Sequence, residues 1–459
     1  MSEKQTNRIG QDFTIWQLVW FAMPALLNNL FTQLFRTLDD GLFVSRFVGE
    51  TALAGINILH PCQMVHVALS HLFAIGSATI SARLMGQGKQ DEAKRVFTRV
   101  TIGCFITGLL YSIVMNLFPN TILNLLGADE AISQYSIVSI KSVYIIESIS
   151  LTSCVFNSYF STAGKPSMGL VCSIVNGTIN IVLDVVLVAV MKLGVLGACI
   201  STVTGEVVVF IIGLIFFIRK KNEIHFVKPQ GDFIPTILKS FKSGLPQCIN
   251  SLSIALLSLL TNRLIMKNLG SEGVAASAII SDLRRVLTTS FVGFVTCVGP
   301  VISYNFGSRN VERLRKILFY TAKIWFFGSL MVTGLGYLIR KPLISIFLSE
   351  SSTQSFYDIA YTGLSIDFIS IPFMAGCVML SRVFVSLGNT KASTALAIMR
   401  VLVFRMLMLY TLPFLIKDIG IWLIYPAAEM LSLSFGGVLL YINRNNYGYG
   451  KNKIAELMN

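Results

Sequence analysis

Long apolar stretches alternate with short polar segments along the whole chain. Stretches of about 18 or more mostly apolar residues recur, and each is long enough to cross a bilayer core of about 30 Å. The pattern predicts about twelve membrane-spanning helices. Their ranges are 15–40, 52–82, 96–118, 135–160, 169–190, 195–218, 241–266, 274–304, 317–339, 359–386, 393–416 and 421–441. No segment between them is long enough for a soluble domain, so we predict an all-α membrane protein.

The second half of the chain repeats the pattern of the first. FAMPALLNNLFTQL resembles KSGLPQCINSLSIAL, and FVGETALAGI resembles NLGSEGVAAS. The aligned pairs are Pro24 with Pro246, Asn28 with Asn250, Gly164 with Gly388, and Gly194 with Gly420. An even number of spans gives both halves the same orientation, so the repeat is parallel, about an axis along the membrane normal. This duplication favours a carrier that works by rocking two lobes over a channel or a receptor.

The predicted domains are an N-terminal six-helix lobe at 1-218, a basic cytoplasmic linker at 219-240 and a C-terminal six-helix lobe at 241-459. Pro229 and Pro235 interrupt the linker. The N-terminal polar stretch is short and no small-residue cleavage site follows the first apolar run. We therefore interpret that run as a permanent helix and not as a signal peptide.

Composition and charge fit a membrane protein. Hydrophobic residues make up 54% of the chain and charged residues only 13%, against about 25% charged in soluble proteins. The net charge of +14 comes mostly from the termini and even-numbered loops, which is the positive-inside bias. We therefore predict a multi-pass protein of the cell inner (cytoplasmic) membrane with both termini cytoplasmic. Its partners would include membrane lipid, with no nucleic acid, and we expect a monomer.

Cysteine and histidine patterns give no sign of a metal site. The eight cysteines all fall within apolar spans and form no CxxC pair, so they are interpreted as small core residues. His60, His66 and His71 share the second span, and His225 lies in the linker. The spacing of the first three does not align them on one helix face. We expect satisfied polar residues near a cavity, with no cofactor and no resident metal.

The clearest candidate site lies in the fifth span, CSIVNGTINIVLDVVLV. Asn176, Asn180 and Asp184 repeat every four residues and therefore share one helix face. Lipid cannot satisfy such groups, so this polar seam is predicted to face the lobe interior. For Asn176 a structural role as hydrogen-bonding contact between helices is favoured. A carboxylate in mid-helix is a costly contact, so Asp184 is predicted to be functional.

Other polar residues of the first half join this candidate. Asp39 and Asp40 end the first span, Asn157 lies in the fourth, and Thr202 in the sixth. Their oxygens would replace the water shell of a small cation such as Na⁺; alternatively, the desolvated carboxylates would carry protons. Arg36 lies four residues before Asp40, where it would be either a structural ion pair or a displaceable counter-ion.

The second half carries fewer candidates. Asp282 and Arg285 have an i, i+3 spacing and are predicted to pair with each other. Asp367 is left open between a second-lobe site and an ion pair. The partners considered for it are Arg382, Arg400 and Arg405. Abundant Met and Phe would give a cavity an adaptable apolar lining, although most must pack helices or face lipid.

Several segments follow one another in a distinctive order over nearly the whole chain. They are DDGLFVSRFVGETALAGIN, RLMGQGKQDEA, AGKPSMG, NIVLDVVLV, LGVLGACIST, VAASAIISDLR, GPVISYNFGSRNVERLRK, SLGNTKAS and GIWLIYPAAEM. This order resembles the multidrug and toxic compound extrusion (MATE) family, more closely its MepA-like branch. The resemblance implies twelve helices in two six-helix lobes arranged in a V, and antiport in which entering Na⁺ or H⁺ drives a drug out.

The resemblance also assigns residues. It places the coupling cation on Asp40, Asn180 and Asp184, with Asn157 and Thr202 as supporting oxygens. Glu429 matches an acidic position near the start of the last helix, and Arg400 a basic one in the eleventh span. Four positions depart from the family: Asp39 replaces an apolar residue, Arg36 an aromatic one, and Thr296 and Gly299 lie where glutamines are usual. These departures leave the substrate range open.

We therefore predict a secondary active antiporter that exports organic, mostly cationic drugs, with Arg36, Asp39, Asn176, Asp367, Arg400 and Glu429 as candidate cavity residues. The alternative is a flippase for lipid-linked oligosaccharide, which Arg36, Arg263 and Arg284 would serve by binding pyrophosphate. The sequence shows no nucleophile–base pair and no metal cluster of the kind that a membrane enzyme would need, so we do not predict an enzyme. The repeat aligns Asp40, Asn180 and Asp184 with Asn262, Phe404 and Met408. The prediction therefore places ion coupling in the first half.

Overall fold

The computed structural model describes residues 8–38, 43–345 and 354–444, and within these ranges the regular elements are all helical. The chain divides into two compact units, Met1–Cys248 and Ile249–Asn459. Each unit is treated separately below. The predicted lobe and linker limits, and the arrangement of two lobes in a V, stay predictions.

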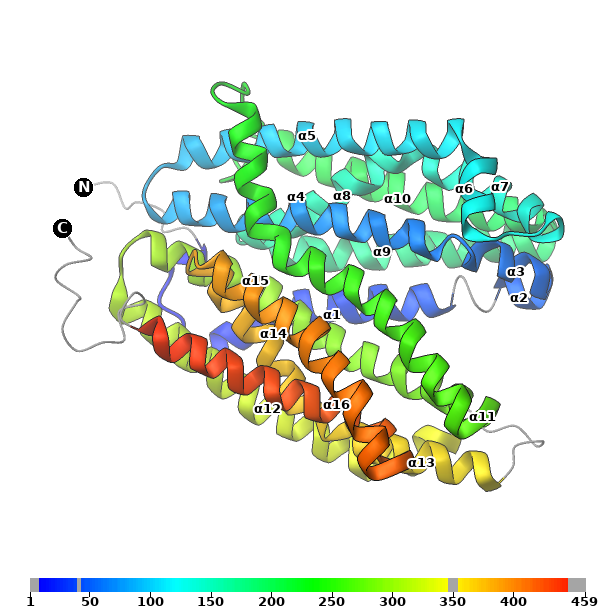
Figure 1. Ribbon diagram of the computed structural model, residues 1–459. Coiled ribbons are helices and arrows are strands. Elements are labelled where there is room, and N and C mark those ends of the chain that lie inside the picture. Colours follow the sequence, from blue (N-terminus) through cyan, green and yellow to red (C-terminus); the bar gives the residue numbers. More distant parts are fainter. Residues whose placement is uncertain (1–7, 39–42, 346–353, 445–459) are drawn as a thin grey trace. The chain divides into compact units, whose positions relative to one another are not determined.

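The first unit holds the helices shown in blue to green in Figure 1. They are η1 (Arg8–Gly10), α1 (Ile15–Leu38), α2 (Val44–Phe47), α3 (Glu50–Asn57), α4 (His60–Gly86), α5 (Gln90–Leu117), α6 (Pro119–Leu126), α7 (Glu130–Val143), η3 (Tyr144–Ile146), α8 (Glu147–Thr162), α9 (Pro166–Asp184), η4 (Val185–Val190), α10 (Gly194–Ile218) and the beginning of α11 (Phe233–Gly307). The last residues of the predicted linker, from Phe233, are thus helical.

The second unit holds the rest of α11 and the helices that follow it. They are α12 (Val311–Ser345), α13 (Gln354–Phe368), α14 (Ser370–Ser386), α15 (Thr390–Ile398), η5 (Met399–Phe404) and α16 (Arg405–Ile442). Two long helices are broken inside: α11 at Gly270, and α16 at Ile416 and Lys417.

The predicted all-α membrane fold is confirmed. Among the described residues, eight helices are long and apolar enough to cross a membrane, or nine if α13 and α14, which meet at a 43° bend, form one span. Counting α1 and the segments on either side of the breaks in α11 and α16 separately makes the structure consistent with twelve spans. The predicted ranges match these helices, and most of the helix ends lie a few residues further out.

The internal repeat is visible in the backbone. Left-handed residues, with φ between 49° and 119°, recur at matching places in the two halves. The pairs are Gly49 with Gly270, Gly88 with Arg309, Gly164 with Gly388, and Lys192 with Lys417. Each pair lies at a helix break or turn, where a left-handed residue reverses the chain and only glycine adopts that conformation without strain. Gly194 is also left-handed, whereas its predicted counterpart Gly420 is not. A Cβ at Gly420 would lie 2.3 Å from the carbonyl oxygen of Leu412, so close packing explains that glycine.

Each unit has its own packed interior. In the first, α9 packs between α1 and α10, and α8 contacts α4, α5 and α10. Phe97 is fully buried there, with ring centroids of Tyr159 and Phe217 both 4.7 Å away. In the second, α14 packs on α12 and α16, and α13 lies against α12 and α16. Gly363 of α13 allows the indole of Trp422 to approach closely.

The fifth long helix of each half contains a π-helical segment. In the first unit η4 follows Asp184 directly, and in the second η5 begins at Met399 and ends just before Arg405. A π segment bonds each residue to the fifth one along, which changes which side chains lie above one another, and such segments are frequent at functional sites. Both segments adjoin charged residues inside the membrane-spanning region.

Candidate functional sites

The polar seam on α9 lies against α10. Asp184 is fully buried and accepts a hydrogen bond from the hydroxyl of Ser201. Asn180 is buried, and its Nδ2 donates to Thr202 Oγ1 at 3.4 Å. Asn176 lies opposite Gly205, where a Cβ would come within 2.1 Å of its Oδ1. Asn176, Asn180 and Asp184 therefore lie against Gly205, Thr202 and Ser201 of α10, respectively.

The seam offers oxygens to a cation. Asn180 Oδ1 is buried and has no hydrogen-bond donor among the described residues. Asp184 is also buried, Thr202 is in contact with Asn180, and Ser201 adds a hydroxyl that the sequence did not single out. Carboxylate, amide and hydroxyl oxygens are ligands that hard cations prefer.

Asn157 lies in a separate polar cluster. Asn28 of α1 donates through Nδ2 to Asn157 Oδ1 of α8 at 3.1 Å, and Asn28 also accepts a hydrogen bond from Ser173 of α9. The hydroxyl groups of Thr32 and Ser173 form a hydrogen bond of 2.8 Å. The structure thus places Asn157 where α1, α8 and α9 meet.

Two predicted site residues lie outside the described residues, namely Asp39 and Asp40. Arg36 belongs to α1, which ends at Leu38. The proposed Arg36–Asp40 ion pair and the role of Asp40 therefore stay predictions.

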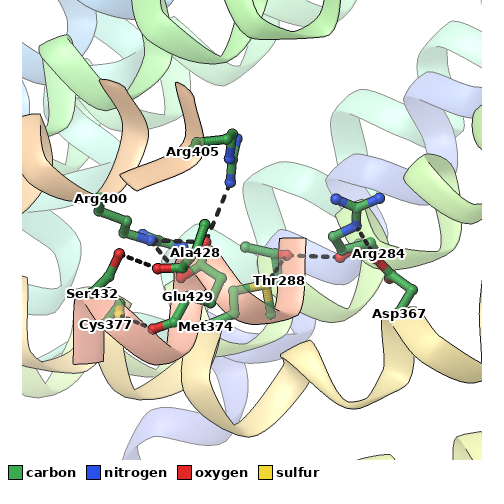
Figure 2. A network of polar contacts seen from close by, with 10 residues as sticks. All are labelled: Arg284, Thr288, Asp367, Met374, Cys377, Arg400, Arg405, Ala428, Glu429 and Ser432. Carbon is green, nitrogen blue, oxygen red and sulfur yellow. Dashed lines mark hydrogen bonds and ion pairs between the residues drawn. The ribbon is translucent and has the colours of Figure 1, made fainter. Parts of the chain in front are cut away.

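A larger charged network lies inside the second unit (Figure 2). Glu429 of α16 is almost fully buried and bonds two arginines. Arg400 Nε lies 2.8 and 3.0 Å from its two carboxylate oxygens, and Arg405 Nη2 lies 3.3 Å from Oε1. Cys377 of α14 adds a hydrogen bond to the Glu429 carbonyl at 3.6 Å. Arg400 and Glu429, both singled out from the sequence, therefore contact each other directly.

The π segment explains why two arginines reach one carboxylate. Arg400 lies within η5 and Arg405 follows it, five residues later. In an α-helix, residues five apart point in different directions, whereas a π-helix brings residue i near residue i+5. Both side chains can therefore face Glu429.

Asp367 of α13 extends the network, and its partner was not predicted. It pairs with Arg284 Nε of α11 at 3.2 Å rather than with Arg382, Arg400 or Arg405. The correction has a simple cause: α11 and α13 are separated in sequence by α12, and helix spacing says nothing about which helices are neighbours. Arg284 and Arg405 also lie 3.4 and 3.8 Å from the ring centroid of Tyr425.

The predicted pair of Asp282 and Arg285 is confirmed at 3.1 Å, and both side chains are more than half exposed. Arg382 of α14 packs against Gly299, where a Cβ would lie 2.8 Å from its Nε. Gly299 is one of the four positions that depart from the family, and the Arg382 side chain occupies the space beside it that a larger residue would need. Arg382 Nε has no hydrogen-bond partner among the described residues.

One buried pair in the first unit was missed. His66 Nδ1 of α4 lies 2.6 Å from Glu147 Oε1 of α8, and Cys154 Sγ lies 3.9 Å from His66 Nε2. Glu147 occupies the first turn of α8, after the 3₁₀ segment Tyr144–Ile146 interrupts the span. The sequence does place a histidine and an acid in two different apolar spans, which is the pattern that could have predicted this pair. Pairing them requires knowing that α4 and α8 are adjacent.

Comparisons with known proteins identify the family. The MatE family model matches residues 24–186 and 246–411, one match in each half. The multidrug export protein MepA of Staphylococcus saprophyticus is 22% identical over 77% of this chain and 78% of its own. The probable multidrug resistance protein YoeA of Bacillus subtilis is 21% identical over 97% of this chain and 96% of its own.

A solved structure has the same fold over nearly the full length. It is the outward-facing conformation of a multidrug resistance MATE family transporter of the MOP superfamily, with a TM-score of 0.89 at 21% identity, covering 98% of this chain and 100% of that one. Its fold, the two family matches and the repeated helices agree. The chain belongs to the MatE family and is a multi-pass membrane transporter of the MepA-like branch.

Proposed function

We propose that this transporter is a secondary active antiporter that exports organic, mostly cationic drugs across the cytoplasmic membrane. The relatives named as multidrug export and resistance proteins support drug export. Entry of Na⁺ or H⁺ would supply the energy through alternating access, with both chain termini in the cytoplasm and no cofactor. Under this proposal the protein catalyses transport and no chemical step.

The observation that carries the coupling proposal is the burial of Asp184. An ionisable group inside the membrane costs about 2.5–3.5 kcal/mol on insertion scales and is rarely kept without a function. Asp184 is fully buried, and Ser201 is the residue that donates a hydrogen bond to it from α10. A cation or a proton arriving at this carboxylate would neutralise it.

Asn180 and Thr202 would act with Asp184. The Asn180 side chain donates to Thr202, which orients its buried Oδ1 as an acceptor for a cation. Asp40, at the end of the first predicted span, would provide the second carboxylate. Occupied and empty states of this site would favour different conformations, and that differential affinity is the requirement for coupling drug exit to ion entry.

The test uses everted membrane vesicles, ethidium as the transported cation, and Na⁺ and pH gradients imposed separately. Asp184→Asn is expected to abolish gradient-driven ethidium transport, because the amide cannot be neutralised by the coupling ion. The gradient that drives the wild type identifies the ion. Asp282→Asn is the matched control, since Asp282 is an exposed acid paired with Arg285 on α11.

The amount of each variant in the membrane is measured by immunoblot, so that loss of protein is separated from loss of coupling. Asp282→Asn is expected to transport ethidium at the wild-type rate. Gradient-driven transport at the wild-type rate by Asp184→Asn would show that this carboxylate does not couple the ion.

A further inference from the structure

The charged network of the second unit has more positive than negative side chains. Three guanidinium groups, of Arg284, Arg400 and Arg405, contact two carboxylates, of Asp367 and Glu429. Among the described residues, no other acidic side chain forms an ion pair with these arginines. The network therefore has one positive charge in excess, within a membrane-spanning region.

An organic cation does not fit this network. Glu429 is 1% exposed and is held by two arginines, and Asp367 is 6% exposed and held by Arg284. A cation would have to break these ion pairs and approach a net positive charge at the same time. The two acids that were candidates for binding a cationic drug are thus already neutralised.

Not every guanidinium donor of the network bonds a carboxylate. Only Nε of Arg284 faces Asp367, and its two terminal nitrogens point away from that carboxylate (Figure 2). The side chain of Arg405 is 5% exposed, and its Nε has no hydrogen-bond partner in the described part of the chain. The Nε donor of Arg405 is buried and charged, and it requires an acceptor.

Tyr425 holds two of the arginines close together. The guanidinium carbons of Arg284 and Arg405 lie 3.4 and 3.8 Å from its ring centroid. The ring attracts both cations, but it supplies no full negative charge to balance them.

We infer that Arg405 and Arg284 of the second unit bind an oxyanion, a carboxylate or a phosphate group carried by the exported compound. The planar guanidinium group matches both oxyanions through paired hydrogen bonds. The bound group neutralises the excess charge and accepts a hydrogen bond from the unused donor of Arg405. The substrate class is then organic molecules with an acidic group, including zwitterions whose cationic part binds elsewhere. This inference rests on the proposed export function for its physiological meaning, but binding is measured without transport.

The experiment measures binding to the purified full-length protein in detergent micelles. The probe pair is a fluorescent quinolone with a free carboxylate and the ethyl ester of the same quinolone. The wild type is expected to bind the acid more tightly than the ester by about tenfold, the value of one charge-assisted hydrogen bond. Arg405→Gln is expected to bind both probes equally, because it removes both the excess charge and the unused donor.

The controls separate recognition from stability. Arg405→Gln leaves Glu429 bonded to Arg400 at 2.8 Å, so the fold retains that pair. Arg405→Lys keeps the charge but not the planar fork, and an intermediate preference for the acid is expected. Arg285→Gln is the matched control, because Arg285 follows Arg284 on α11 but is 58% exposed and paired with Asp282; it is expected to keep the wild-type preference.

Competition by benzoate and phenyl phosphate distinguishes the two oxyanions. Displacement of the acid probe by one of them in the wild type, but not in Arg405→Gln, supports the inference and names the group. An equal affinity of the wild type for acid and ester, or an unchanged preference in Arg405→Gln, overturns it. Failure of ethidium transport by the wild type would instead refute the proposed antiport, whatever these binding measurements show.

Discussion

Glu147 and His66 form the buried acid–base pair of the first unit, with 2.6 Å between Oε1 and Nδ1. Their side chains are 4% and 20% exposed. The pair joins α8 to α4, and Cys154 completes its surroundings. A group buried this deeply gains little from water, so most of its stabilisation comes from its partner.

We predict that Glu147→Leu lowers the free energy of unfolding by about 2–3 kcal/mol, because it leaves the His66 nitrogen without its partner. The double variant His66→Leu/Glu147→Leu is expected to recover part of this loss, since two apolar side chains replace the pair. Unfolding of purified protein by SDS in mixed micelles measures both. Additive losses in the double variant would show that the two residues do not stabilise each other.

At the scale of elements, α5 and the segment after α10 are tied together within the first unit. Arg99 of α5 is 8% exposed; its Nη1 donates to Thr236 Oγ1 at 2.9 Å and its Nη2 to the carbonyl of Gln230. Gly231, with φ of 97°, leaves room for this guanidinium. The neighbouring Thr98 accepts from the amide of Val227 at 3.1 Å.

We predict that Arg99→Gln speeds amide hydrogen exchange in residues 226–232 by about tenfold, because the charged hydrogen bond from Arg99 to the Gln230 carbonyl holds the segment closed. Hydrogen-exchange mass spectrometry of the purified protein measures this. Arg95→Gln is the control, one turn earlier on α5 and exposed to solvent. Equal protection of the segment in wild type and Arg99→Gln would mean that Arg99 does not hold it.

A π-helical segment interrupts the fifth long helix of each half. One segment follows Asp184, and the other carries Arg400 and precedes Arg405. In each half the π segment therefore changes the directions of the side chains next to the charged residues of that helix. The positions are not equivalent in the repeat. Each half therefore uses the same device for different chemistry, an acidic seam in one and an excess of arginine in the other.

At the scale of the whole molecule, the distribution of basic residues predicts orientation. The turn between η4 and α10 is short, whereas the segment between α10 and α11 carries Arg219, Lys220 and Lys221. Cytoplasmic loops are enriched in such residues. The two connections, separated by the one span α10, must lie on opposite sides of the membrane.

We predict that a fluorescent protein fused after residue 230 is fluorescent, and that alkaline phosphatase fused after residue 192 is active. The first reporter matures in the cytoplasm and the second only outside it, so the pair tests the positive-inside assignment. The exchanged fusions, phosphatase after 230 and fluorescent protein after 192, are the controls and are expected to be inactive. Activity of the exchanged pair alone would reverse the predicted orientation.

Local pattern alone determined a large part of this protein. Long apolar stretches gave the helices, because each must satisfy its own backbone hydrogen bonds within the bilayer. The four-residue spacing of Asn176, Asn180 and Asp184 put the three side chains on one helix face. The i, i+3 spacing of Asp282 and Arg285 gave their ion pair. All of these are properties of one helix considered by itself.

Only the tertiary structure decided which helices meet. Ser201 beside Asp184, Arg284 beside Asp367, and His66 beside Glu147 each join residues from different helices. The meeting of Arg400 and Arg405 at Glu429 additionally required a π segment, which α-helical spacing does not predict. Partner choice between helices depends on packing across the unit, and a sequence of apolar spans is compatible with many packings. The charge balance of the second unit, and the oxyanion that we infer from it, follows from that packing alone.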